Sequence, residues 1–193
     1  MRKIILFTIV LFFALTGANG QALPKVAINT ALGEIIVEID TVHAPVTAFN
    51  FLKHVENSTY KNAVFYRVVR MDNQPDNKVK IEVIQGGLFD DEQIEKVVPI
   101  RHETTKETGL KHLNGTISMA RVGPGTASTE FFICVGDQPE LDFGGKRNPD
   151  GQGFAAFGKV LKGFDVVEKI QKQKDERQML LAPVRILKVE VLR

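Results

Sequence analysis

Apolar and polar residues alternate along several short stretches of the chain, which is the pattern of half-buried β-strands. The first two stretches, residues 25–30 and 34–39, are joined by a short connection that contains Gly33, a typical hairpin signal. Further strands are predicted at residues 63–69, 80–85, 115–120, 130–135, 154–160 and 184–191. The chain is therefore expected to be mainly β, with about eight strands.

Helical spacing of apolar residues occurs in only two places. Pro45 opens the first, which runs to about Val55, and proline suits the first turn of a helix. The second covers residues 164–170, while residues 88–112 and 136–153 read as long surface connections. Because strands do not alternate with helices, a doubly wound sheet is excluded. We expect a closed eight-stranded antiparallel β-barrel, capped by two α-helices that cover its open ends.

The N-terminus has a pattern of its own. Two basic residues precede an apolar run at residues 4–15, and small residues follow at 17–20, as in a secretory signal peptide. The run is shorter than the ~20 residues of a spanning helix, although an uncleaved anchor is the alternative. We expect a signal peptide at 1–20, one domain at 21–193, and a periplasmic or secreted protein without a membrane attachment after cleavage.

Composition adds little beyond a globular class. Hydrophobic residues make up 44% of the 193 residues and charged residues 25%, and the net charge is +2 at pH 7. The predicted leader holds two of the positive charges and no acidic residue, so the mature chain would be neutral, which argues against nucleic-acid binding. We expect a monomer that needs no metal and no cofactor.

The cysteine and the histidines give no metal-site spacing. Cys134 is the single cysteine and lies in an apolar strand, so a buried, inert thiol is expected. His43, His54, His102 and His112 are too scattered for a zinc site, and solvated or capping roles are expected for them.

Six short motifs follow one another along the chain. They are Phe65-Tyr66-Arg67, Gln85-Gly86-Gly87, Gly115-Thr116-Ile117-Ser118-Met119-Ala120, Ser128-Thr129-Glu130-Phe131-Phe132-Ile133, Leu141-Asp142 and Phe157-Gly158. In this order and spacing the chain resembles cyclophilin-type peptidyl-prolyl cis-trans isomerases over residues 25–193. The resemblance implies an eight-stranded barrel capped by two helices, which agrees with the pattern of the strands.

Rotation about an X–Pro bond is slow because amide resonance opposes it with a barrier of ~18–20 kcal/mol. The cis and trans forms differ by only ~0.5–1 kcal/mol, so a catalyst must bind the twisted amide better than either planar form. The resemblance assigns this task to Arg67, which would bond the prolyl carbonyl and approach the ring nitrogen. We therefore predict an isomerase of X–Pro bonds that assists folding and binds proline-containing peptides and unfolded or folding proteins.

The same resemblance implies a substrate-binding set. Adjacent strand residues point to opposite faces, so Phe131 and Phe132 cannot both enter one core. The resemblance places Phe131 in the core and makes Phe132 the floor of a proline pocket outside the barrel. The full set of binding positions that it implies is Val83, Gln85, the backbone at Ala120 and Arg121, Glu130, Phe132, Leu141 and Phe154.

Several of these positions depart from common family residues. Phe154 stands where many members have histidine, Val83 where methionine is common, and Glu130 where glutamine is common. Arg121 replaces a common asparagine and would make the rim more charged. Glu140 stands where drug-sensitive members carry tryptophan, so weak cyclosporin binding is expected.

Two other classes of function remain open. A proline-peptide binding module or chaperone with little turnover would suit the altered rim. A purely structural barrel is disfavoured by Arg67 on an otherwise apolar site, because a lone arginine there needs a partner. The retained Arg67, Gln85 and Phe132 favour the enzyme.

Overall fold

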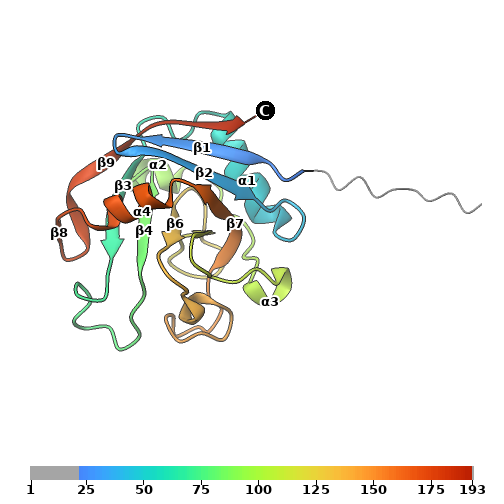
Figure 1. Cartoon of the computed structure of the whole chain (residues 1–193). Helices are drawn as coiled ribbons and strands as arrows, with labels where there is room; N and C mark the ends of the chain where they lie inside the picture. Colours follow the sequence, from blue (N-terminus) through green and yellow to red (C-terminus); the bar gives the residue numbers. More distant parts are fainter. Residues whose placement is uncertain (1–21, 193) are drawn as a thin grey trace, which may run out of the picture.

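Eight strands close into a barrel in the computed structural model, which describes residues 22–192 (Figure 1). The order around the barrel is β1-β2-β7-β5-β6-β4-β3-β9, and β9 pairs back with β1. All pairings within the described residues are antiparallel. The expected barrel is therefore confirmed. The predicted signal peptide lies outside the described residues.

The strand positions agree with the predicted ones apart from their ends. The strands are β1 Lys25–Thr30, β2 Gly33–Ile39, β3 Val64–Val69, β4 Val83–Gly87, β5 Thr116–Met119, β6 Phe131–Cys134, β7 Ala155–Lys162, β8 Asp175–Glu176 and β9 Met179–Leu192. The helices are α1 Pro45–Glu56, α2 Asp91–Glu95, α3 Thr105–Thr108, α4 Phe164–Gln171 and the 3₁₀ turn η1 Pro139–Leu141. No helix of residues 22–192 is both long and apolar enough to cross a membrane.

The structure differs from the prediction at β4, which begins at Val83 and not at residue 80. The reason is a buried side chain, Gln74, whose amide oxygen accepts from the Ile81 N–H (3.3 Å) and whose amide nitrogen donates to the Ile81 carbonyl (2.7 Å). Because both backbone groups of Ile81 are engaged in this way, the ladder starts later.

Short elements also occur where none was predicted. The region 88–112 contains α2 and α3, whose first turns are capped by the side chains of Asp90 and Thr104. The two-residue strand β8 forms a hairpin with the start of β9, outside the closed barrel (Figure 1). These elements are too short for a hydrophobic period to show in the sequence.

The first of the two predicted helices, α1, begins at Pro45 as expected and is held at its N-terminus by a residue far along the chain. The buried Glu103 carboxylate accepts from the backbone N–H of Val46 (3.2 Å) and of Thr47 (2.7 Å), and from the Thr47 hydroxyl (2.7 Å). A carboxylate there satisfies free N–H groups and complements the helix dipole.

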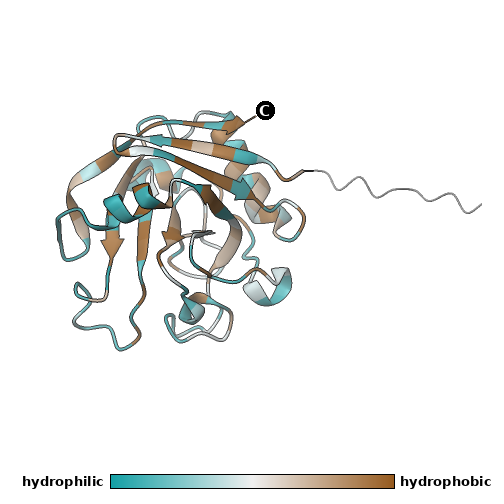
Figure 2. Ribbon diagram, in the orientation of Figure 1, coloured by the Kyte–Doolittle hydropathy of each residue, from teal (hydrophilic) through white to brown (hydrophobic). Residues whose placement is uncertain are grey.

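The barrel interior is packed with aromatic rings. Phe131 meets Phe51 and Phe65 edge-on, with ring centroids 5.6 and 5.8 Å apart, and Phe51 also contacts Phe157 at 5.2 Å. Such edge-to-face pairs suit the quadrupole of the rings. In Figure 2 hydrophobic colour follows the strands, whereas hydrophilic colour gathers in the connecting loops.

A second, smaller apolar cluster lies outside this core. It consists of the buried residues Val69, Ile81, Val83, Phe132, Cys134 and Leu141, with Ala120 and Phe154 packed against it. Strand β6 contributes to both clusters, since Phe131 and Ile133 face the interior while Phe132 and Cys134 face the outer cluster. The predicted burial of Cys134 is confirmed, and burial raises the pKa of its thiol.

Candidate active site

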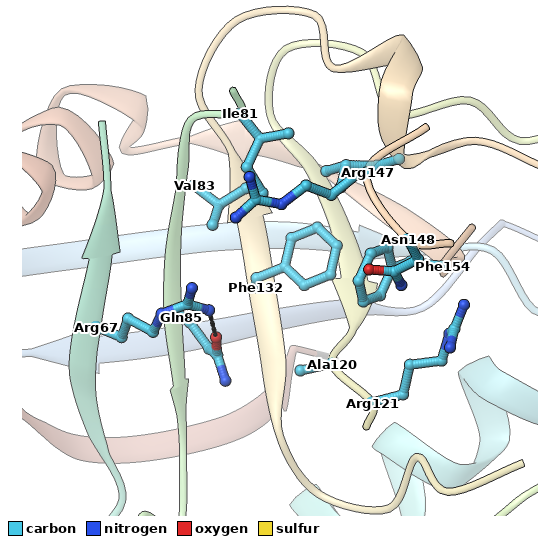
Figure 3. A pocket seen from close by; sticks show the side chains of 11 residues that line it. Arg67, Ile81, Val83, Gln85, Ala120, Arg121, Phe132, Arg147, Asn148 and Phe154 are labelled. Atoms are coloured by element: carbon cyan, nitrogen blue, oxygen red, sulfur yellow. Dashed lines mark hydrogen bonds between the residues drawn. The ribbon is translucent and has the colours of Figure 1, made fainter. Parts of the chain in front are cut away.

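A pocket of about 230 Å³ opens over the outer cluster (Figure 3). Eight of the nine site residues expected from the sequence line it, and Glu130 does not. Three further lining residues, Ile81, Arg147 and Asn148, were not expected. The complete lining is Arg67, Ile81, Val83, Gln85, Ala120, Arg121, Phe132, Leu141, Arg147, Asn148 and Phe154.

The floor of the pocket is the ring of Phe132, which is only 4% exposed. The Phe154 ring meets it edge-on at a centroid distance of 5.3 Å and an angle of 88°. On another side the ring of His112 is stacked on it, at 5.9 Å and 15°. A flat apolar ring held between two others can receive another small ring without large rearrangement.

The structure shows that His112 is buried, which contradicts the expected solvated or capping role. Its Nδ1 lies 2.8 Å from an Asp142 carboxylate oxygen and its Nε2 lies 3.0 Å from the Ser118 hydroxyl. Burial lowers the pKa of His112, although Asp142 opposes that shift. His54 is likewise buried, beside Tyr60. His112 therefore supports the floor as a neutral ring fixed at both nitrogens.

Arg67 projects from β3 to one side of the floor, and two amide oxygens hold its guanidinium (Figure 3). Nη1 donates to Gln85 Oε1 at 2.8 Å, while Nε and Nη2 donate to Gln178 Oε1 at 3.1 and 2.6 Å. No ion pair within residues 22–192 involves Arg67. The neutral acceptors orient the fork without cancelling its charge.

Gln178 had no sequence signal and lies 111 residues from Arg67. It sits in the turn between β8 and β9 with a positive φ of 74°, and its N–H donates to Asp175 at 2.9 Å. The short hairpin thus brings an amide to Arg67 that no local pattern could reveal.

Gln85 is oriented by a further contact. Its amide nitrogen donates to the Tyr66 hydroxyl at 2.6 Å, so its oxygen is turned toward Arg67. Glu130, which was expected to contact the substrate, does not line the pocket; its half-buried carboxylate lies against Gly87 and accepts from the Leu88 N–H at 2.7 Å. A Cβ at Gly87 would overlap that carboxylate, and burial raises the pKa of Glu130.

The Arg121 side chain lines the pocket, but its charge is already paired. Its guanidinium forms two bonds to the Asp150 carboxylate, at 2.8 and 2.9 Å, and donates twice to the Gly153 carbonyl, at 2.8 and 2.6 Å. It also lies over the Phe154 ring, 5.1 Å from the centroid. The expectation that Arg121 adds charge to the rim is therefore wrong; the residue anchors the neighbouring loop.

Within the described part of the chain, no cluster of His, Cys, Asp and Glu side chains has the geometry of a metal site. The pocket combines an apolar floor with an oriented cation, and it contains no nucleophile beside a base. Such an arrangement suits binding and electrostatic stabilisation rather than bond cleavage.

Comparison with known proteins identifies the family. The family described as "Cyclophilin type peptidyl-prolyl cis-trans isomerase/CLD" matches residues 25–191. The chain belongs to this family. The activity class expected from the sequence, isomerisation of X–Pro peptide bonds by an enzyme, is thereby confirmed.

Bacterial relatives of this cyclophilin-type chain align over most of its length. A peptidyl-prolyl cis-trans isomerase of Acinetobacter baylyi is 38% identical over 165 residues, which cover 84% of this chain and 79% of the relative. Peptidyl-prolyl cis-trans isomerase B of Escherichia coli is 35% identical over 149 residues, which cover 76% and 83% of the two chains.

Solved structures support the fold. A cyclophilin-type isomerase of Cryptosporidium parvum superposes with a TM-score of 0.69 at 22% identity, covering 89% of this chain and 98% of that one. A second structure of that protein, determined in the presence of the dipeptide Ala-Pro, gives a TM-score of 0.66 at 23% identity.

Proposed function

We propose that this cyclophilin-type isomerase works at the pocket over Phe132, with Arg67 as its catalytic residue. One observation carries the proposal: the guanidinium of Arg67 is fixed by two neutral amides beside an apolar floor and forms no ion pair within residues 22–192. Its full charge is thus available to a substrate, in surroundings where electrostatic interactions are stronger than in water.

The apolar walls would hold the proline ring of the substrate. The ring would rest on Phe132, between Val83, Leu141 and Phe154. The amide of Gln85 and the backbone at Ala120 and Arg121 would hold the flanking peptide by hydrogen bonds. The proline is then restrained while the preceding peptide group remains able to turn.

Arg67 would act on the twisted state of the bond. When the amide loses planarity, its nitrogen regains a lone pair, and a fixed guanidinium favours that electron density more than the delocalised planar form. No bond is made or broken, so the residue must only be positioned and charged. Burial lowers the pKa of Arg67, but an arginine stays protonated in proteins.

The test is the cis-to-trans conversion of a short X–Pro peptide by the protein without residues 1–20, compared with Arg67→Ala. Loss of one oriented donor is expected to reduce kcat/KM by about 10²- to 10³-fold. Arg185→Ala, which removes an exposed arginine of β9, is the matched control and should keep full activity.

The other outcomes are equally informative. Activity that survives in Arg67→Ala would keep the isomerase and remove Arg67 from its role. A well-folded wild type without any activity would favour the peptide-binding module or chaperone, and affinity for proline peptides would be measured next.

We further propose that the enzyme acts outside the cytoplasm, in the periplasm or after secretion, as a monomer. The basic, apolar and small-residue pattern of residues 1–20 supports export. Mass spectrometry of the protein from the producing cell would test this. A mature chain that begins near residue 21 supports cleavage, and an intact N-terminus contradicts it.

A further inference from the structure

Besides Arg67 and Arg121, a third arginine lines the pocket, and the isomerase proposal gives it no role. Arg147 belongs to the loop between η1 and β7 and lines the pocket together with Arg67. In Figure 3 the side chain of Arg147 passes above the Phe132 ring, and its guanidinium lies next to Ile81 and Val83. A proline ring on that floor would have this cation beside it.

Arg147 is held in place by the loop between β3 and β4. Its Nη1 donates to Gln74 Oε1 at 3.0 Å and to the Val79 carbonyl at 2.6 Å. Gln74 is fully buried, and its amide also bonds the backbone of Arg70 and Ile81. Within residues 22–192, these bonds engage only one of the three guanidinium nitrogens of Arg147.

The charge of Arg147 has no counter-ion in the described part of the chain. Neither Arg147 nor Arg67 forms an ion pair there, whereas Arg121 in the same pocket is paired with Asp150. Glu140 is close along the loop, but its carboxylate accepts from the backbone N–H of Lys146 at 2.7 Å. The pocket therefore carries two uncompensated positive charges.

The charge of Arg67 is close enough to act on the guanidinium of Arg147. Burial and the charge of Arg67 together lower the pKa of Arg147. Two like charges at one apolar site are unfavourable on their own, and a bound anion would relieve both. If Arg147 served only to link its loop to the loop between β3 and β4, that role would explain the hydrogen bonds of Nη1 but not the positive charge in the pocket.

We propose that Arg147 is a specificity residue that selects X–Pro substrates with an Asp or Glu next to the proline. The inference rests on the proposed function of this pocket. With the ring on Phe132, the side chain of a neighbouring residue comes within reach of the remaining nitrogens of Arg147. A planar fork with a fixed orientation matches a carboxylate and forms charge-assisted hydrogen bonds with it.

The test compares two peptide series, with the variable residue either directly before or directly after proline, and that residue being Glu, Gln or Lys. Rates are measured by NMR exchange spectroscopy, and affinities by titration of the same samples. In one series the Glu peptide is expected to exceed the Gln peptide by about five- to tenfold in kcat/KM and in affinity, with Lys below both.

Arg147→Gln is expected to abolish the preference for the Glu peptide over the Gln peptide, so that the ratio of the two falls to about one. Lys146→Gln, which removes an exposed charge from the adjacent position of the same loop, is the matched control and should keep that preference. The readout is a ratio of two peptides on one sample, so a partly unfolded variant does not imitate the result. In the wild type the ratio should also shrink as salt is raised, because the site is open to solvent.

Equal values for Glu and Gln in both series would overturn the proposal, as would a ratio that survives in Arg147→Gln or ignores salt. Failure of the isomerase proposal is seen separately. If no peptide is turned over, the affinity ratio alone still decides whether Arg147 recognises a carboxylate.

Discussion

The two faces of strand β6 have different surroundings, although the four residues of the strand point alternately to one face and the other. The inner face, with Phe131 and Ile133, packs into the hydrophobic core of the barrel. The outer face, with Phe132 and Cys134, belongs to a small cluster bordered by cations, an amide and a buried histidine. The inner face has the composition of a stabilising core, and the outer face has that of a binding site.

The two faces of β6 also differ in how their phenylalanine rings are held. Phe131 is surrounded by the rings of Phe51, Tyr60 and Phe65 and has no exposed area. Phe132 lies between His112 and Phe154, and one of its surfaces borders the pocket. Changes on the inner face should therefore act on stability, and changes on the outer face on activity.

Phe131→Ala should have the largest effect on the fold. Removing a fully buried ring leaves a cavity inside the closed barrel, and the free energy of unfolding should fall by about 3–5 kcal/mol. Urea denaturation followed by circular dichroism measures this. A loss below about 1 kcal/mol would show that the interior is not the close-packed core inferred here.

Phe132→Ala should separate activity from stability. Water can fill the space it leaves, so the free energy of unfolding should fall by roughly half as much as for Phe131→Ala. The proline ring loses its floor, worth about 1.5–3 kcal/mol, and kcat/KM should fall about 10- to 100-fold. Parallel urea and isomerisation assays would detect this, and unchanged kcat/KM would exclude Phe132 as the floor.

Loss of the ion pair between Arg121 and Asp150 should have the smallest effect on the free energy of unfolding. The structural change should be confined to the pocket rim. Hydrogen bonds from Arg121 lower the pKa of Asp150 to about 2, from its usual 3.8. Since the folded-state pKa is the lower one, the pair stabilises the protein fully above about pH 4 and loses this contribution as the pH falls to about 2.

The measurement is the free energy of unfolding of the wild type and of Asp150→Asn across that pH range. The two should differ by about 1 kcal/mol or less at neutral pH, because Asp150 is partly exposed, and they should converge toward pH 2. A difference that is constant with pH would contradict the assignment of the shift to this pair.

Much of the site could be foreseen because the motifs are local and ordered. Arg67, Gln85 and Phe132 were expected together, and the structure brings them to one pocket. Glu130 was expected in the pocket and does not line it, and the side chain of Arg121 lines the pocket but has its charge paired. The direction of a long side chain depends on which partners surround it, and for Arg121 those partners, Asp150 and Gly153, are about 30 residues away.

The eight barrel strands, apart from their ends, the start of α1 at Pro45 and the opposite facing of Phe131 and Phe132 could be predicted from the sequence. These follow from hydrophobic periods and from backbone preferences, which are local properties of the chain. Three features of the site became visible only in the folded chain: Gln178 holds Arg67, His112 supports the floor, and Arg147 enters the pocket. Each of these contacts joins segments far apart in the chain, and closure of the barrel is what brings such segments together.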